Sequence, residues 1–433
     1  MFHLHVTGTM NAPIQNRDVY NEETGMQLVK KSVYGAVLLF AAGGASAQTS
    51  VTLYGVVDVF GQFLYNGSGT KGGPGTAYVP GSHSYSERSG GQTGSMFGLK
   101  GSEDLGGGLK AIFDLESGFN VNNGGFFADS TAMFYRQAWV GLKHDNWGQL
   151  SFGRQYQPSF LALYPTDPFR GNEVLSPISA LDVSSGRDRA TLAGQYVSGR
   201  TSNSIVYQSP DWRGLHFYGM YAFAATVTQP VPMTSGNMID LAATYSGYGL
   251  FLGLGYQFQH AGSETASLGQ YPAGTPLAGQ PLPASTFDLV STAHYAAAIA
   301  YRIGIVNLQF NYSYSSPTAP PPGARVTAPG VGTLAPLSAL VHPYSIIEAG
   351  ATIQATPVDV IEFAGVYRSV RGVDDNTPGF EIGAEHFLSK RTSFYLRAGY
   401  LKNNGIANVS WPGVVTADGS KQVLAVLGMT HRF

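Results

Sequence analysis

Several stretches of the chain alternate between apolar and polar positions. The clearest is residues 306–314, where apolar or aromatic side chains stand at every even position and polar ones at every odd position. Apolar residues at every second position recur in residues 250–258, 394–400 and 423–429. Because successive side chains of a strand point to opposite faces, this period predicts β-strands with one apolar and one polar face. Repeated in segments of about ten residues, it is typical of a transmembrane β-barrel.

Short turn-like segments and long connections alternate from residue 50 onward. The seven expected turns are residues 103–108, 144–148, 209–214, 246–249, 302–304, 355–359 and 388–391. The eight longer connections, rich in Gly, Pro, Ser and Ala, are residues 66–93, 120–133, 157–201, 225–237, 260–290, 316–343, 371–378 and 403–420.

Seven hairpins, with a first strand at residues 51–65 and a last one at 421–433, predict sixteen strands. A barrel of this size encloses an aqueous channel. We therefore predict an all-β fold, a 16-stranded antiparallel transmembrane β-barrel with short periplasmic turns and long extracellular loops. A β-propeller would also have many short strands, but its repeats would be uniform in length.

Composition supports a membrane environment. Only 12% of the 433 residues are charged, whereas water-soluble proteins typically carry about 25%. The absence of cysteine excludes disulfides and thiolate metal sites. A helical membrane protein is excluded because no long apolar run follows residue 47.

The N-terminal region has the pattern of an export signal. Lys30 and Lys31 precede an apolar run over residues 33–42, and an Ala-Ser-Ala site ends at Ala47. We expect a signal peptide at residues 26–47 and a mature chain over residues 48–433, located in the outer membrane of a Gram-negative bacterium. A membrane anchor would need a longer run. Residues 1–25 are interpreted as an upstream start-site extension.

Strand parity assigns charged side chains to the inner face of the barrel. The expected lumen-facing residues are Glu362, Arg368, Glu381, Glu385 and Arg397. A charge on the lipid side would cost roughly 2–4 kcal/mol for Arg or Lys at mid-membrane, which enforces this parity. Each charge could instead only solvate the wall and pair with its neighbours.

Short motifs spread over the mature chain carry a family resemblance. They are residues 50–58 (SVTLYGVVD), 101–111 (GSEDLGGGLKA), 136–141 (RQAWVG), 152–155 (FGRQ), 388–392 (LSKRT) and 431–433 (HRF). Together they resemble the Gram-negative trimeric general porins of the beta-proteobacterial type, such as those of Neisseria, Burkholderia, Bordetella and Comamonas. The resemblance implies a homotrimer in which the third extracellular loop folds into the barrel.

The same resemblance implies a pore constriction. Arg136 and Arg200 match arginines that line the constriction wall in the family, while Met96 stands where the second strand usually has an arginine. We expect the third loop, residues 157–199, to fold inward and to turn its carboxylates toward these arginines. The carboxylates are Asp167, Glu173, Asp182 and Asp188. The loop could instead lie over the top of the barrel.

No enzyme motif occurs in the chain, and no cofactor, metal or nucleic-acid partner is predicted. The predicted function is an outer-membrane porin, a water-filled channel for passive diffusion of small hydrophilic solutes and ions. The alternatives are an outer-membrane barrel lipase or protease, and an adhesin or phage receptor borne by the long loops. The other expected partners are outer-membrane lipid, lipopolysaccharide and the barrel-assembly machinery. Phe433 resembles the terminal aromatic residue that this machinery recognises as an assembly signal.

Overall fold

The computed structural model describes residues 50–71, 77–126, 132–171, 176, 199–224, 236–266, 285–318, 325–328, 332–336, 341–407, 409–411 and 419–433. The expected start-site extension and signal peptide lie outside these residues, as do Glu173, Asp182 and Asp188. The fold is that of the compact unit Gln48–Phe433.

The described residues form strands, with little helix. The strands are β1 (Ser50–Asn66), β2 (Gly69–Lys71), β3 (Ala77–Val79), β4 (Ser82–Ser89), β5 (Met96–Gly106), β6 (Leu109–Gly118), β7 (Gln137–His144), β8 (Gly148–Tyr156), β9 (Arg200–Gln208), β10 (Leu215–Ala222), β11 (Met238–Gly247), β12 (Leu250–Gln259), β13 (Gly262–Ala266), β14 (Ser285–Leu289), β15 (Thr292–Ile303), β16 (Val306–Pro317), β17 (Arg325–Ala328), β18 (Gly332–Pro336), β19 (Tyr344–Gln354), β20 (Asp359–Val370), β21 (Asp375–Phe387), β22 (Thr392–Lys402), β23 (Asn404–Gly405) and β24 (Lys421–Arg432). A short helix α2 (Pro158–Leu163) and a 3₁₀ turn η1 (Tyr164–Thr166) lie between β8 and β9.

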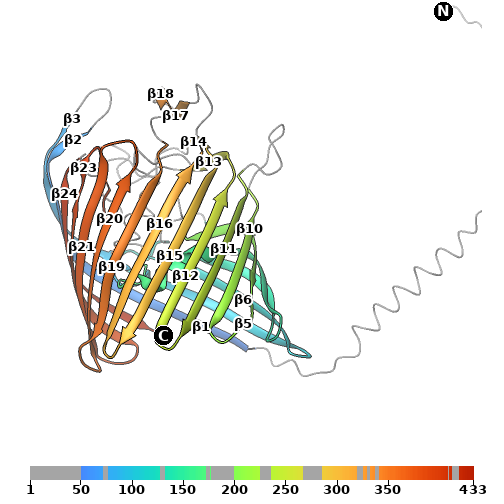
Figure 1. The fold of residues 1–433 in the computed structure, drawn as a ribbon. Helices are drawn as coiled ribbons and strands as arrows, with labels where there is room; N and C mark the ends of the chain where they lie inside the picture. The colour runs from blue at the N-terminus through green and yellow to red at the C-terminus, as the bar shows by residue number, and fades with distance from the viewer. Residues whose placement is uncertain are drawn as a thin grey trace, which may run out of the picture. The chain divides into compact units, whose positions relative to one another are not determined.

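One antiparallel sheet closes on itself as a barrel (Figure 1). Sixteen strands form the wall, and closure comes from β1, whose residues Val56–Asn66 pair with Arg432–Gln422 of β24. Closure pairs every wall strand on both sides, so no edge is left open. The predicted 16-stranded barrel is confirmed.

The first long connection differs from the prediction. Residues 66–93 are predicted to be a loop, yet β4 lies within this range and pairs with the upper half of β1. The lower half of β1 pairs with β5 instead. Periodicity misses β4 because its sequence, SHSYSERS, has no alternating apolar set. Similarly, β21 begins at Asp375, inside the predicted loop 371–378.

The seven short connections lie where the sequence predicts turns. Three of them contain only two residues, and one of these joins β11 to β12 through Tyr248 and Gly249, with φ angles of 53° and 77°. Two consecutive positive φ angles are those of a type I′ turn, whose twist matches that of the flanking strands. In Figure 1 such turns lie at the end of the barrel that also holds the C-terminus, and the longer connections lie at the other end.

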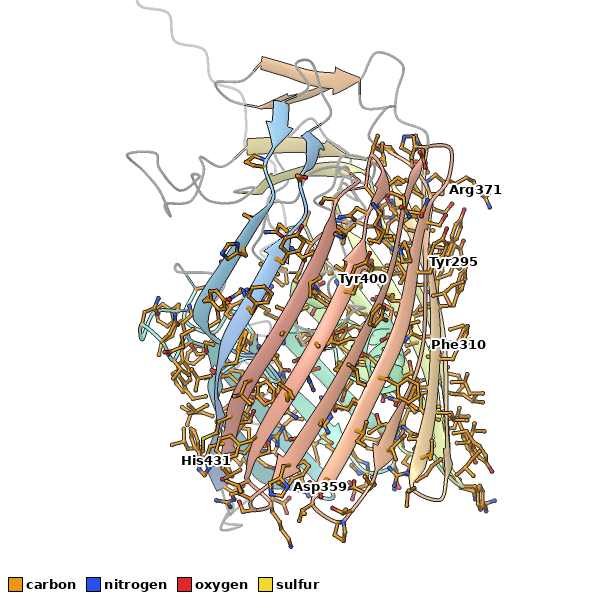
Figure 2. The ribbon with its side chains drawn as sticks, turned by 90° about the vertical axis from the view of Figure 1, so that its left-hand side faces the viewer. Tyr295, Phe310, Asp359, Arg371, Tyr400 and His431 are labelled. Atoms are coloured by element: carbon orange, nitrogen blue, oxygen red, sulfur yellow. The ribbon has the colours of Figure 1, made fainter. Side chains whose placement is uncertain are left out.

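Side chains alternate across the wall as the pattern predicts. Along β20, Ile361, Phe363 and Tyr367 are exposed, whereas Glu362 and Arg368, at alternate positions, are buried. Phe310 of β16 and Tyr295 of β15 are exposed as well and project from the outside of the barrel in Figure 2. An apolar outer surface is what contact with lipid requires.

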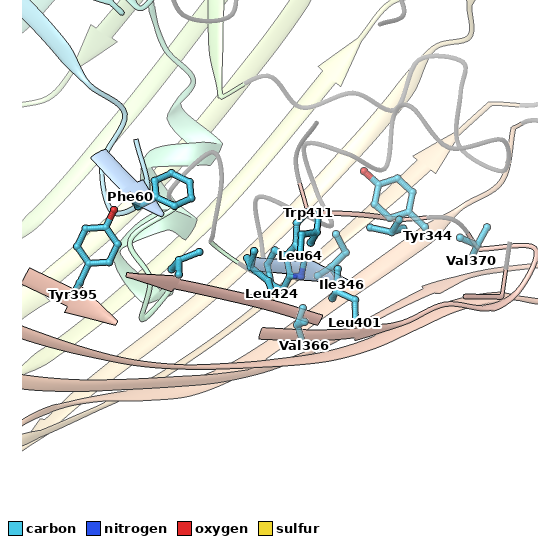
Figure 3. Packing of buried hydrophobic residues seen from close by; sticks show 12 residues of the cluster. Phe60, Leu64, Tyr344, Ile346, Val366, Val370, Tyr395, Leu401, Trp411 and Leu424 are labelled. Carbon is cyan, nitrogen blue, oxygen red and sulfur yellow. The ribbon is translucent and has the colours of Figure 1, made fainter. Parts of the chain in front are cut away.

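Part of the inner wall is apolar, although parity alone predicts a polar lining. Buried side chains from β1, β19, β20, β22 and β24 form one cluster: Phe60, Leu64, Tyr344, Ile346, Val366, Val370, Tyr395, Leu401, Val409, Trp411, Leu424 and Val426 (Figure 3). Two members, Val409 and Trp411, belong to the last long connection, so this part of the connection packs against the inside of the wall. Apolar residues can therefore face inward here, because protein covers them.

Two short hairpins, β13 with β14 and β17 with β18, are separate from the barrel sheet. They lie in the long connections 260–290 and 316–343. In the described part of the chain, no helix has the length and apolar character needed to cross a membrane.

Candidate functional site

The segment after β8 runs across the interior of the barrel. Pro158 occupies the first turn of α2, a position where its missing N–H costs nothing. One side of the helix, with Ser159, Ala162 and Leu163, is buried against the wall. The opposite side carries Phe160 and the 40% exposed Tyr164. The described part of the third loop thus folds inward, as predicted.

A carboxylate on the wall holds the start of α2. Asp240 of β11 accepts hydrogen bonds from the Ser159 backbone N–H at 2.8 Å and from the Ser159 hydroxyl at 2.7 Å. Gln257 of β12 donates to the same carboxylate at 3.0 Å. Helix N-termini have unpaired N–H groups and a partial positive charge, so Asp240 acts as a cap supplied by the wall.

Glycines on the inner face give the loop room to lie close. A Cβ at Gly253 would lie 2.2 Å from the Ala162 carbonyl oxygen, and one at Gly255 would lie 3.0 Å from Ser159. At Gly350 a Cβ would lie 2.7 Å from Pro168. Since larger residues would collide with the loop at these positions, the glycines fix how closely it can approach.

Further along the described part of the loop, after η1, a carboxylate of the loop itself holds the chain. Asp167 accepts bonds from the Phe169 N–H at 2.7 Å and the Gly171 N–H at 2.8 Å, and also from the Ser176 hydroxyl. The buried carboxyl group of Glu348 of β19 lies beside it. Burial raises the pKa of Asp167. The structure thus gives Asp167 a role in folding and docking the loop, and the expectation that it faces Arg136 and Arg200 stays a prediction.

The five residues assigned to the inner face by parity are all buried, and three of them lie in ion pairs beside this loop. Arg397 donates to Glu362 at 2.9 Å, and its guanidinium lies 4.9 Å from the Phe169 ring. Arg170 of the loop reaches Glu385 at 3.3 Å.

The remaining two of the five are Arg368 and Glu381. Arg368 pairs with Asp375 at 2.5 Å. Glu381 is also buried, and neither carboxylate oxygen has a hydrogen-bond partner in the described part of the chain. The charges thus pair largely with one another or with the loop.

Arg136 lies just before β7, and Arg200 is the first residue of β9. Both therefore lie at the ends of wall strands that are farthest from the short turns. Arg136 forms an ion pair with Glu116 of β6 at 2.5 Å. Arg200 donates to the Tyr156 hydroxyl at 2.7 Å, and its guanidinium lies 4.5 Å from the centre of that ring. The two arginines therefore have different partners, one acidic and one aromatic.

Sequence reasoning missed Glu116, the ion-pair partner of Arg136, and the polar side chains around it. Tyr54 of β1 donates to Asp114 at 2.6 Å and lies 3.2 Å from Glu116, while the Lys100 ammonium lies 4.9 Å from the Tyr54 ring. These residues share the inward parity of β1, β5 and β6, and that parity is the signal that could have found them. Among the described residues, no group of three or more His, Asp or Glu side chains could hold a metal ion.

Comparison with known proteins gives consistent matches. A family model described as Gram-negative porin matches residues 35–406. An outer membrane porin protein of Bordetella pertussis is 28% identical, and the alignment covers 94% of this chain and 100% of that protein. Outer membrane porin protein 32 of Delftia acidovorans is 27% identical over the same shares. The anion-selective porin from Comamonas acidovorans has a similar fold, with a TM-score of 0.65, 21% identity, and coverage of 89% of this chain and 100% of that one.

Proposed function

The chain belongs to the Gram-negative porin family and forms an outer-membrane channel for passive solute diffusion. We propose that its docked third loop and wall charges select which small hydrophilic solutes and ions pass. The observation that carries this proposal is the inward first part of the loop, held at Ser159 by Asp240 and around Phe169 by Asp167. A segment fixed at two points inside a barrel narrows it without needing a conformational cycle. The proposed function involves no catalytic step.

Single-channel recording tests this function directly. The protein inserted into a planar lipid bilayer in KCl should give stepwise current increases, each with a steady ohmic conductance. Vesicles that contain it should swell in small neutral sugars but not in large ones, because a narrowed aqueous passage discriminates by diameter. Insertion without any conductance step would contradict the proposed function.

We propose that Arg136 and Arg200 set the charge preference of the passage. Replacing Arg136 with alanine leaves Glu116 without its arginine, so a negative charge faces the permeating ions. The permeability ratio of K⁺ to Cl⁻ should rise roughly fivefold, because an ion near an unpaired charge gains about 1 kcal/mol in water. Met96→Arg should move the ratio in the opposite direction. The readout is the reversal potential in a KCl gradient.

Arg371→Ala is the matched control for this prediction. Arg371 is exposed at the end of the barrel opposite the short turns (Figure 2). A charge there is screened by salt within a Debye length, about 8–10 Å. If Arg136→Ala and Arg371→Ala give the same reversal potential, other residues set the preference.

We further propose that three copies associate through the outer face of β1 and β4. Gly61 of β1 is exposed and pairs with Leu427 of β24 on one side and with Glu87 of β4 on the other. The exposed Glu87 carboxylate therefore lies on the outer face of the barrel, at the level of the apolar Leu427. A carboxylate at that level is unfavourable against lipid.

Gly61→Trp should dissociate this assembly. A Cβ at Gly61 would meet nothing within 4 Å of this chain, so the bulky ring would project outward into the neighbouring copy. In mild detergent, light scattering should give the mass of three chains for the wild-type protein and of one for the variant. Gly365→Trp, on the exposed face of β20, should remain trimeric. A monomeric wild-type protein would refute the assembly.

A further inference from the structure

Three aromatic rings form a continuous stack along the inward loop. Tyr156 at the end of β8, Phe160 of α2 and Tyr164 of η1 are spaced four residues apart, so one helical face carries the last two. The centres of Tyr156 and Phe160 are 5.5 Å apart with planes inclined by 8°, and those of Phe160 and Tyr164 are 5.5 Å apart at 9°. We call these three side chains the aromatic ladder.

The ladder is held rigidly at its base. Arg200 lies over the Tyr156 ring and donates to its hydroxyl, which fixes the first ring from both its face and its edge. A Cβ at Gly199 would lie 3.3 Å from the Phe160 ring, so the returning chain packs closely against the middle ring. Because these contacts already restrict the rotation of the rings, a solute that binds to them would lose less conformational entropy.

Phe160 and Tyr164 of the ladder lie on the side of α2 opposite the residues that pack against the wall. The residues of α2 that contact the wall are Ser159, Ala162 and Leu163, whereas Phe160 is half-buried and Tyr164 is 40% exposed. Among the described residues, Tyr164 has a stacked neighbour on one side only, and its partly exposed ring is the outer end of the ladder. Packing alone does not require this arrangement, because the loop is already anchored by Asp240 and Asp167.

We propose that the aromatic ladder is a stacking track for solutes that carry a planar aromatic ring. The inference rests on the proposed channel function and names a class of solute for it. A planar ring can stack on Tyr164 as a further member of the series, while the wall charges remain available to its polar substituents. An aliphatic ring of similar size lacks the flat π face and gains only from contact area.

The test compares benzoate with cyclohexanecarboxylate, two carboxylates of equal charge and similar size. In single-channel recordings, each is added to KCl and the concentration that halves the current is measured. For the wild-type channel, benzoate should block at a concentration roughly two- to tenfold lower, because ring stacking adds free energy beyond buried area. In Tyr164→Leu, which keeps an apolar side chain without a ring, the two half-block concentrations should become equal.

A control variant and the KCl conductance distinguish failure of the stacking track from failure of the channel function. Phe310→Leu removes an exposed ring from the outer wall and should keep the wild-type ratio. KCl conductance itself reports whether a channel forms, so its loss would refute the proposed function rather than the track. A normal conductance with equal block by both carboxylates in the wild type would overturn the track, as would a Tyr164→Leu ratio that equals the wild-type ratio.

Discussion

Replacing Asp58 with alanine should lower the free energy of unfolding of the barrel by about 3–5 kcal/mol. The Asp58 carboxylate is fully buried on the inner face of β1 and accepts five hydrogen bonds. Three come from the backbone N–H groups of residues 91–93, at 2.7–3.2 Å. The other two come from the hydroxyls of Tyr395 and Thr430, at 2.7 and 2.5 Å.

The cost is large because alanine leaves these donors buried without their acceptor, and hydrogen bonds to a charged group are worth about 1.5–3 kcal/mol each. The bonds also join β1 to β22, to β24 and to the segment between β4 and β5, so they tie the seam where the barrel closes. Asp58→Asn keeps one acceptor oxygen and should be less damaging. The measurement is the urea midpoint of the barrel refolded into phospholipid vesicles.

Asp104→Ala is the matched control. Asp104 also accepts a backbone hydrogen bond, from the Gly106 N–H at 2.9 Å, but in an exposed turn. Water can replace that bond, so the midpoint should change little. If Asp58→Ala unfolds at the same urea concentration as Asp104→Ala, the buried carboxylate does not hold the seam.

Gly253→Val should lower single-channel conductance at least twofold while leaving the barrel folded. The first added carbon would lie 2.2 Å from the Ala162 carbonyl oxygen, against an ordinary contact of 3.4 Å or more, so α2 must move by about 1 Å or more. The wall is a continuous ladder of backbone bonds, whereas the loop is held by a few side-chain contacts. The loop should therefore yield, and it can move only toward the lumen.

Conductance in KCl and the heat-modified mobility of the folded barrel on a gel measure the two parts of this prediction. Gly365→Val provides the comparison, since Gly365 lies on the outer face of β20 and a Cβ there would approach no atom closer than 3.9 Å. It should conduct like the wild type. An unchanged conductance in a folded Gly253→Val barrel would mean that α2 does not narrow the passage.

The positions of the strands follow from the sequence because their cause is local. Lipid on one side of the wall and water or protein on the other impose a period of two on each strand, and glycine at a turn such as Tyr248–Gly249 marks where it reverses. Sixteen strands, seven turns and the inward parity of residues such as Glu362 and Arg397 are therefore predictable from local patterns. The segment β4 escapes because its polar sequence carries no such period, and only pairing with β1 defines it.

Other features depend on contacts between distant segments. Arg136 and Arg200 are found by family resemblance, but the charge that one contacts and the ring that the other contacts come from the structure. Ser159 and Asp240 are 81 residues apart, and Tyr395 and Asp58 are 337 apart. No local pattern links such pairs, since closing so long a loop is repaid only when the whole barrel forms. The sequence by itself determined the wall of this protein; the tertiary structure alone decided how its third loop docks, which inner surfaces are apolar because protein covers them, and which side chains face the passage.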